Sequence, residues 1–322
     1  MTYEMFLNVG DIVTKVTSLS APCETEKNRF KYHQFILKRV PPKIDIQLNL
    51  TVIPRYKKFK QKEIFAARRD APKKRHRFHN RILSRNKPPD KEAEKYLGEG
   101  LDWRMSKVGK KVLMEGGTSG KYQLLLDEDL KKGALFLVNS DNKWKTTDII
   151  YGFLQVLTIF YLAKNKLGIL VHAAGLKDGK EGYLFAGLSR AGKSTTTRIW
   201  DNQPSVKILN DDRIIIRKFG RQLDMYATPW HGDYSDYLES SVEKTELTKL
   251  FYIYHKKTNK AQEVSPLEGF NLFFQTLFIP VWDKNCLKFV SNFLLDTFLS
   301  KPSYKFGFKN DKKVIDYVRS VK

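Results

Sequence analysis

The sequence predicts an α/β protein, in which an α/β domain over residues 165–322 follows a mostly β region over residues 1–164. In the second part, the apolar run Gly182–Ala186 leads into a glycine-rich loop, and the stretch Ser194–Trp200 reads as a helix. In the first part, polar and apolar residues alternate over Ile44–Leu50, as they do in a strand with one buried face. We therefore expect strands and helices after residue 165 and mainly strands before it.

Residues 187–194 fit the phosphate-binding pattern G-x-x-x-x-G-K-[ST] at every fixed position. The glycines let backbone amides turn inward around phosphate oxygens, Lys193 reaches the outer phosphates, and the Ser194 hydroxyl is available to a magnesium ion. The helix behind the loop directs its positive N-terminal end at the anion. A glycine-rich turn with a surface lysine is the alternative, but the strand before it and the helix after it favour a nucleotide triphosphate. The predicted nucleotide-binding residues are Gly187, Ser189, Arg190, Ala191, Gly192, Lys193, Ser194 and Thr195.

An acidic pair, Asp211 and Asp212, ends the apolar run that begins at Val206. Asp211 stands eighteen positions after Lys193. A carboxylate at a strand end beside a phosphate loop can hold magnesium, directly or through water. Its neighbour can then accept the proton of an attacking hydroxyl. The alternative is a solvated Asp-Asp turn, which the spacing from the loop disfavours.

A histidine lies in the strand-like run Leu167–Gly175, just upstream of the loop. Asp178-Gly179 is a tight-turn signal, so this run and the one entering the loop are expected to pair as an antiparallel hairpin. That pairing places His172 roughly opposite Ala186, near the start of the loop. A histidine in an apolar strand is also a common core residue, and both interpretations stay open.

Four stretches, taken together, resemble the HPr serine kinase-like proteins, which are relatives of HPr kinase/phosphorylase and, more remotely, of ATP-dependent phosphoenolpyruvate carboxykinase. The resemblance covers residues 165–320 in order and spacing. It implies a mixed-sheet P-loop kinase that transfers the terminal phosphoryl group of ATP, or another nucleotide, to a serine hydroxyl with Mg²⁺ as cofactor. Acceptors in the family include carrier proteins, free serine and ribosomal precursor peptides. The stretches are His172–Gly175, Gly187–Thr195, Leu209–Asp212 and Ala227–Gly232.

The resemblance also implies roles for single residues. Asp211 is expected to be the catalytic base with His172 beside it, whereas Asp212 and Ser194 are expected to serve the metal. Lys193 is expected to act on the transferred phosphoryl group.

A further loop, Thr228–Asp233, holds the predicted substrate-binding residues Trp230 and His231, with Asp233 as another candidate contact. A rigid turn with a packed tryptophan is the alternative here. Within the phosphate-loop stretch the chain departs from HPr kinases proper, because Thr195 stands in place of Glu and Arg190 in place of a small residue.

The net charge of +23 is unevenly placed. Residues 55–87 hold fourteen Lys or Arg against two acidic residues, a net charge of +12. Without apolar periodicity, a basic loop at about 55–90 is predicted, exposed to solvent. Three interpretations stay open: a solvated loop, a docking site for an acidic peptide or protein, and contact with a nucleic acid backbone.

The two cysteines, Cys23 and Cys286, lie far apart without metal-type spacing, so two unrelated thiols in a reducing compartment are expected. The start of the chain lacks the basic and apolar regions of a secretory signal. The longest apolar run, Ile149–Ala163, is interpreted as a buried helix too short to span a bilayer. A soluble cytoplasmic protein without a membrane partner follows.

The remaining elements are predicted from local pattern. A helix is expected over about Thr147–Lys164, a hairpin around Gly220, and a helical aromatic core stripe over Pro266–Leu299. Further strands are expected at Tyr32–Leu37, Tyr122–Leu126, Ala134–Val138, Ile214–Arg217, Leu223–Tyr226 and Phe251–Tyr254.

These features favour a nucleotide-dependent kinase that phosphorylates a serine of a peptide or protein, with the mostly β region recognising the acceptor. A free-serine kinase is one alternative. The other is a nucleotide-binding regulatory protein that contacts nucleic acid through the basic segment.

Overall fold

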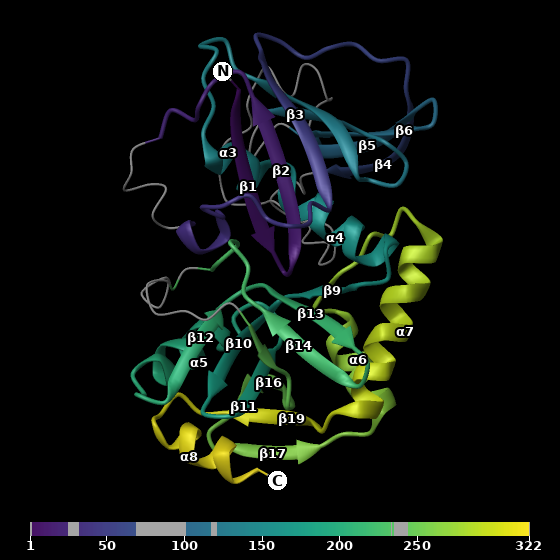
Figure 1. The fold of residues 1–322 in the computed structure, drawn as a ribbon. Coiled ribbons are helices and arrows are strands. Elements are labelled where there is room, and N and C mark those ends of the chain that lie inside the picture. Colours follow the sequence, from purple (N-terminus) through teal and green to yellow (C-terminus); the bar gives the residue numbers. More distant parts are fainter. Residues whose placement is uncertain are drawn as a thin grey trace. The chain divides into compact units, whose positions relative to one another are not determined.

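The computed structural model describes residues 2–24, 32–68, 101–116, 121–232, 234 and 244–321. The chain divides into two compact units, Met1–Tyr161 and Leu162–Lys322, and each is considered by itself (Figure 1). The sequence-based division was set at residue 164.

The first unit contains an eight-stranded mixed sheet in the order β1-β2-β3-β8-β7-β6-β5-β4. The pairs β2–β3 and β3–β8 are parallel, and the remaining pairs are antiparallel. The alternation predicted for β3 is confirmed, because Ile46, Leu48 and Leu50 are buried while the residues between them are exposed. The strands are β1 (Tyr3–Val9), β2 (Ile12–Ser18), β3 (Ile46–Ile53), β4 (Lys62–Arg68), β5 (Leu101–Val108), β6 (Lys111–Gly116), β7 (Tyr122–Leu126) and β8 (Lys132–Val138).

Two predictions for this unit are wrong. Tyr32–Leu37 is no strand: it contains a 3-10 turn, His33–Phe35, and only Ile36 bridges to Leu7. The basic loop was expected from residue 55 onward, but β4 forms within it because it pairs with β5. Its side chain Phe65 contacts Trp103, with ring centroids 5.2 Å apart. The rest of the predicted basic loop, residues 69–90, lies outside the described residues.

The predicted apolar helix runs from Thr146 to Lys164 as three joined segments: α3 (Thr146–Ile149), the π-type turn η2 (Ile150–Leu154) and α4 (Gln155–Lys164). Within the described part of the chain, it is the one helix long and apolar enough to cross a membrane. The prediction that it is too short is therefore wrong, but its predicted burial is confirmed, since 83% of the apolar window lies inside the protein. Burial of this kind is typical of a core helix.

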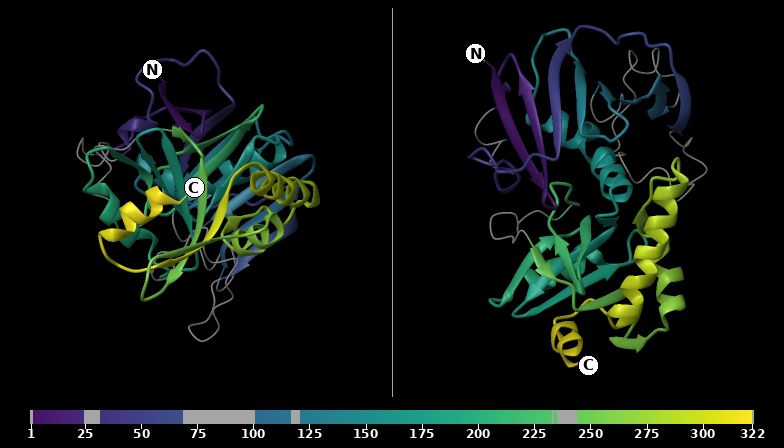
Figure 2. Two further views of the ribbon diagram at one scale, coloured as in Figure 1. Left: turned by 90° about the horizontal axis from the view of Figure 1, so that it is seen from below. Right: turned by 45° about the vertical axis from the view of Figure 1, so that its right-hand side comes forward.

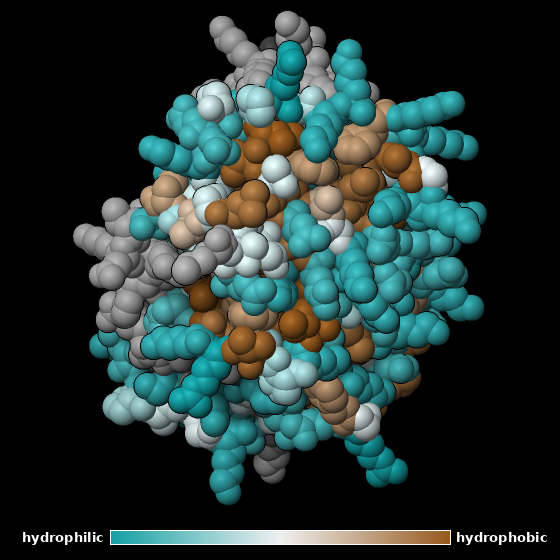
Figure 3. Space-filling model, turned by 45° about the horizontal axis from the view of Figure 1, so that its top comes forward, coloured by the Kyte–Doolittle hydropathy of each residue, from teal (hydrophilic) through white to brown (hydrophobic). Residues whose placement is uncertain are grey.

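On the face shown in Figure 3, hydrophilic side chains cover most of the described surface.

The second unit contains two sheets. The larger has the order β12-β10-β11-β16-β19-β17 and mixes parallel with antiparallel pairs, and the smaller has the order β15-β14-β13-β9-β18. The strands are β9 (Gly168–Val171), β10 (Ala173–Asp178), β11 (Glu181–Ala186), β12 (Val206–Asn210), β13 (Ile214–Phe219), β14 (Gln222–Tyr226), β15 (Lys244–Glu246), β16 (Lys249–His255), β17 (Lys260–Glu263), β18 (Leu277–Phe278) and β19 (Ser303–Phe308).

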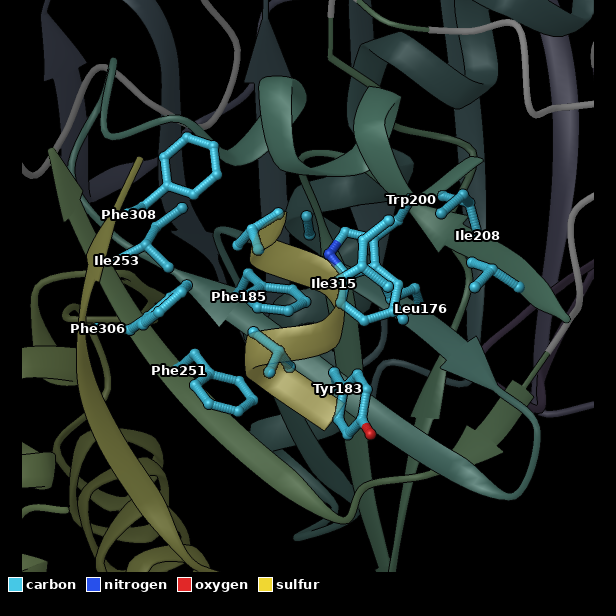
Figure 4. Packing of buried hydrophobic residues seen from close by; sticks show 14 of the residues in the cluster. Leu176, Tyr183, Phe185, Trp200, Ile208, Phe251, Ile253, Phe306, Phe308 and Ile315 are labelled. Carbon is cyan, nitrogen blue, oxygen red and sulfur yellow. The ribbon is translucent and has the colours of Figure 1, made fainter. Parts of the chain in front are cut away.

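Helices cover both faces of the larger sheet. On one face, Trp200 of α5 (Lys193–Asp201) contacts Tyr183 of β11, with centroids 5.8 Å apart, and α8 (Lys313–Ser320) joins the same cluster (Figure 4). On the other face, Phe273 of α6 (Pro266–Phe274) lies 5.8 Å from Tyr252 of β16. The helix α7 (Lys284–Ser300) lies beside α6 (Figure 2). Burying one large aromatic side chain stabilises the fold by about 2–3 kcal/mol, so this aromatic core fixes the direction of α5.

Strand direction explains how the predicted site residues meet. β10 is antiparallel to both β11 and β12, so β11 and β12 end at the same edge of the sheet. β16 is parallel to β11 and β19 to β16, so these two strands end there as well. The glycine-rich loop after Ala186, the acidic turn after Asn210 and the start of β10 at Ala173 therefore share one edge.

The predicted hairpin between β10 and β11 is confirmed, but its register differs by one residue from the expected one, because Ala173 instead of His172 lies opposite Ala186. The single strand predicted over Leu167–Gly175 is wrong, because the chain changes sheets at His172. β9 pairs with β13 and β18, whereas β10 pairs with β11 and β12. At the junction the backbone N–H of His172 donates to the carbonyl of Thr276, 2.7 Å away, which extends the pairing of β9 with β18 by one residue.

Candidate phosphate-binding site

The loop after β11 has the backbone conformation that inward-facing amides require. Arg190 and Gly192 both have positive φ, at 67° and 104°, and Gly192 directly precedes the first residue of α5. The Lys193 side chain is buried, and its Nζ donates to the carbonyls of Gly187 at 3.0 Å and Leu188 at 3.2 Å. The ammonium group therefore lies against the loop, where outer phosphates are expected.

A buried asparagine shapes the acidic turn. The Asn210 side chain accepts hydrogen bonds from the backbone N–H groups of Asp212 and Arg213, both at 2.8 Å, and donates to the carbonyl of Thr228 at 2.9 Å. Asparagine commonly closes a turn through such bonds to residues just ahead of it. The turn presents Asp211 and Asp212 to different partners.

Asp211 faces the phosphate loop and is 1% exposed. Its Oδ2 accepts a hydrogen bond from the Ser194 hydroxyl at 3.2 Å, and its Oδ1 accepts one from the backbone N–H of Gly232 at 2.6 Å. Burial raises the pKa of Asp211, although the Gly232 bond opposes this, and the neighbouring charge of Asp212 raises the pKa further. This carboxylate joins the loop serine to the acidic turn.

Asp212 faces away from that serine, toward two cationic or proton-donating side chains. Its Oδ1 lies 2.9 Å from His172 Nδ1, and its Oδ2 pairs with the guanidinium of Arg213. Burial raises the pKa of Asp212, but the Arg213 charge and the His172 hydrogen bond outweigh it and hold the pKa well below its usual range. Asp212 is therefore a stable anion beside the imidazole.

The proton position on His172 follows from its neighbours. Nδ1 contacts two acceptors, the carboxylate of Asp212 at 2.9 Å and the backbone carbonyl of Asp212 at 3.1 Å. Because both are acceptors, Nδ1 carries the proton, and in the neutral ring Nε2 is then the nitrogen that accepts one. The ring also meets Phe278 edge-on, with centroids 6.4 Å apart, so its plane is fixed.

The structure brings together most of the residues predicted from the sequence. Lys193 and Ser194 at the start of α5, Asp211 and Asp212 after β12, and His172 before β10 gather at one sheet edge. Their catalytic, nucleotide-binding and metal-binding roles remain proposals. Ser189 and Arg190 are exposed, whereas Ala191 is buried and Thr195 half-buried.

The predicted substrate loop fits less well. Trp230 is 1% exposed, so its ring packs inside the unit instead of presenting itself to a substrate, and the alternative of a packed tryptophan holds. The half-buried His231 lies at the protein surface, with Nδ1 3.0 Å from the carbonyl of Gly232. Asp233 lies outside the described residues.

Sequence reasoning missed the residues that support the acidic pair. Arg213 directly follows the pair, and its charge was a readable signal for a stabilised carboxylate. The Gly232 N–H and the Thr228 carbonyl reach the acidic turn only through tertiary folding, and no local pattern indicates them.

The donor set fits magnesium. Among the described residues, no group of three or more His, Cys, Asp or Glu side chains could enclose a metal ion. Magnesium does not need such a group, because it is commonly held by one or two carboxylates together with phosphate oxygens and water. The contact between the Ser194 hydroxyl and the Asp211 carboxylate offers that oxygen-only environment.

Comparisons with known proteins add little. No protein-family model matches the sequence, and no curated protein matches it. Among solved structures, the chain is similar to the HPr(Ser) kinase/phosphatase from Coxiella burnetii, with 12% identity and a TM-score of 0.28 over 47% of this chain and 95% of that chain. This structural similarity is weak, and the function proposed next depends on the geometry of the site.

Proposed function

We propose that the unit Leu162–Lys322 is a nucleotide-dependent phosphotransferase that moves the terminal phosphoryl group of a nucleoside triphosphate to a serine hydroxyl. One observation carries the proposal: the Ser194 hydroxyl of the phosphate loop donates to Asp211 of the acidic turn at 3.2 Å. A loop serine joined to a strand-end aspartate is the arrangement that P-loop enzymes use beside the terminal phosphates.

The phosphates are bound by groups that the fold already directs toward one edge. The amides of Gly192 and Lys193 at the N-terminus of α5 supply partial positive charge, and the Lys193 side chain supplies a full charge. A magnesium ion, held by Ser194 and Asp211, would neutralise charge on the phosphate oxygens.

The geometry favours a division of roles that differs from the one expected from the sequence. The sequence-based expectation was that Asp211 is the base and Asp212 the metal-side residue. Ser194 contacts Asp211, however, whereas Asp212 contacts His172. We therefore assign Asp211 to the metal side. His172 Nε2 accepts the proton of the attacking hydroxyl, and Asp212 holds the imidazole and stabilises its protonated form, as a carboxylate does beside a catalytic histidine.

Label transfer from ATP tests the function. The wild-type protein is incubated with ATP labelled in its γ-phosphate, Mg²⁺ and, separately, free serine or a serine-containing acidic peptide. Lys193→Ala should lower transfer by about 100–1,000-fold, because it removes a charge that stabilises the transition state. Lys180→Ala, at the exposed β10–β11 turn, is the matched control and should transfer normally.

Two outcomes would count against the proposal. Transfer by Lys193→Ala within about tenfold of wild type would mean that the loop is not the catalytic site. Nucleotide binding without transfer to any serine acceptor would favour a regulatory protein.

The acceptor is proposed to be an acidic peptide or protein, because the +12 charge of residues 55–87 would attract it. Neutralising Lys73, Lys74, Arg75 and Arg77, which lie outside the described residues, should raise KM for the acceptor and leave the nucleotide KM unchanged. The effect should shrink with added salt, which screens charges beyond about 10 Å. An unchanged acceptor KM at low salt would favour free serine over an acidic peptide or protein as the acceptor.

The chain's two cysteines are both free thiols, as predicted. We propose a cytoplasmic location, where such thiols stay reduced.

A further inference from the structure

A histidine that the proposed chemistry does not use contacts the phosphate loop from the neighbouring strand. His255 is the last residue of β16, which runs parallel to β11, the strand that enters the loop. Its Nε2 lies 2.7 Å from the backbone carbonyl of Arg190 at the turn of the loop. Because a carbonyl only accepts hydrogen bonds, Nε2 carries a proton and donates it to this contact.

The partner of His255 is the residue whose backbone is strained. Arg190 has φ of 67°, in the left-handed region, although it is not a glycine. That conformation reduces the population of an ordinary L-residue by roughly tenfold relative to its preferred conformations. A hydrogen bond to the Arg190 carbonyl that exists only in this conformation would offset the strain.

The strand ends around His255 also form the support on which the loop lies. A Cβ on Gly187 would approach the Ile253 carbonyl to 2.6 Å, so the first loop glycine lies directly on β16. A Cβ on Gly192 would lie 2.9 Å from the ring of Phe308 and 3.6 Å from Cε1 of His255. Phe308 of β19 is in turn the register partner of His255. The loop therefore lies against β16 at its first glycine, and against β19 and His255 of β16 at its last glycine.

We propose that His255 is a positioning residue for nucleotide binding: its hydrogen bond holds Arg190 in the left-handed conformation and thereby keeps the amides of Gly192 and Lys193 directed at the phosphates. This inference rests on the proposed function of the same loop. His255 touches the loop and not the reacting atoms, so its loss should affect affinity for the nucleotide and leave kcat nearly unchanged.

Two substitutions at one position separate this role from packing. The dissociation constant of ATP with Mg²⁺ is measured by titration calorimetry for wild type, His255→Leu and His255→Gln. Leucine cannot donate, so affinity should fall about three- to tenfold, the loss of one hydrogen bond. Glutamine places an N–H donor the same number of bonds from the backbone and should restore affinity to within about twofold. Because the ring is exposed, all three proteins should melt at similar temperatures.

A second set of variants tests the link to Arg190. His255→Leu is measured again in two backgrounds, Arg190→Gly and Arg190→Ala. Glycine adopts positive φ without penalty, so in that background His255→Leu should have little effect. Alanine removes the same arginine charge but keeps the penalty, so the three- to tenfold effect should persist there. Equal effects in the two backgrounds would overturn the proposed mechanism.

The remaining outcomes distinguish this inference from the function on which it rests. If wild type binds ATP with Mg²⁺ and His255→Leu binds it equally well, the role of His255 is refuted and the proposed function stands. If wild type binds no nucleotide, the proposed function fails and this inference fails with it.

Discussion

Each unit buries a carboxylate, and the two carboxylates differ in where their partners come from. Glu115 in the first unit is completely buried, with its Oε2 2.7 Å from Arg104 Nε and its Oε1 2.7 Å from Gln123 Nε2. Asp211 in the second unit is almost as buried, but its partners are the Ser194 hydroxyl and the backbone N–H of Gly232. Both carboxylates are therefore buried, but they are bound by different types of partner.

The origin of the partners explains the difference. Arg104, Glu115 and Gln123 are register partners on the adjacent strands β5, β6 and β7, so these two partners of Glu115 come from the same sheet. The partners of Asp211 lie outside the sheets: Ser194 is in the first turn of α5, and Gly232 is in the segment that follows β14. A carboxylate satisfied inside a ladder stabilises the sheet, whereas one placed at a strand end beside a phosphate loop is available for chemistry. Four substitutions test whether buried carboxylates and ion pairs in the two kinds of place differ in function.

The largest effect is expected for Asp211→Asn. We expect phosphoryl transfer to fall by about 1,000-fold, because the metal-side charge is lost, and we expect the Mg²⁺ concentration for half-maximal rate to rise. Folding should be retained, since the asparagine oxygen can accept from the Gly232 N–H while its NH2 group donates to the Ser194 hydroxyl oxygen. Steady-state rates across a Mg²⁺ titration provide the measurement. If transfer falls while the Mg²⁺ requirement stays unchanged, Asp211 is the base and the sequence-based division of roles was correct.

A smaller loss, of about 100-fold in kcat, is expected for His172→Asn. The asparagine amide can still donate to Asp212 as Nδ1 does, but it cannot take up the hydroxyl proton. The Mg²⁺ requirement and the nucleotide affinity should therefore stay near wild type. Equal kcat for His172→Asn and wild type would show that the histidine only positions Asp212.

Glu115→Gln should affect stability and leave chemistry intact. The change removes the charge that pairs with Arg104, and we expect the free energy of unfolding of the first unit to fall by about 1–3 kcal/mol. The rate of transfer per folded molecule should not change. Denaturant unfolding and a rate normalised to folded protein provide the two readouts. A large loss of rate at full folding would break the contrast between the two carboxylates.

The smallest effect concerns a partly exposed pair in the second unit. Asp178 accepts hydrogen bonds from Arg319 at 2.7 and 3.0 Å. Burial raises the pKa of Asp178, but the Arg319 and Ser205 hydrogen bonds outweigh it and lower the pKa below its usual value.

A lowered carboxyl pKa in the folded state stabilises the protein above the unfolded pKa, which is about 4, and this contribution is lost as the pH falls through the folded pKa. Arg319→Met should therefore cost up to about 1 kcal/mol at pH 7, and less below pH of about 4. Melting temperatures between these pH values test this, with Lys312→Met, an exposed lysine at the opposite, N-terminal end of α8, as control. A difference independent of pH would mean that Arg319 acts through packing.

Local motifs made much of the site predictable. The loop, α5 and the acidic turn could be placed from the sequence because each is specified within a few residues, and one Asp-Gly turn predicted the hairpin to within one residue of its register. The change of sheet at His172 could not be predicted. It depends on pairings of β9 with β13 and β18, which come much later in the chain.

The supporting residues were missed for the same reason. His255 and Gly232 reach the site through the strand order of the sheets, which no local periodicity encodes. β19 was missed as well, although it supplies Phe308 to the phosphate loop.

The common edge at which β12, β11, β16 and β19 end also constrains when the site can form. The phosphate loop is complete at residue 194, yet one of its contacts, Phe308, lies on β19, more than 100 residues later in the chain. Pairings between segments so distant in sequence are slow to form, because the chain must close long loops first. A nascent chain that carries the whole motif would thus still lack a binding site. Nucleotide affinity then depends on the pairing of β19 with β16 as well as on the presence of the motif.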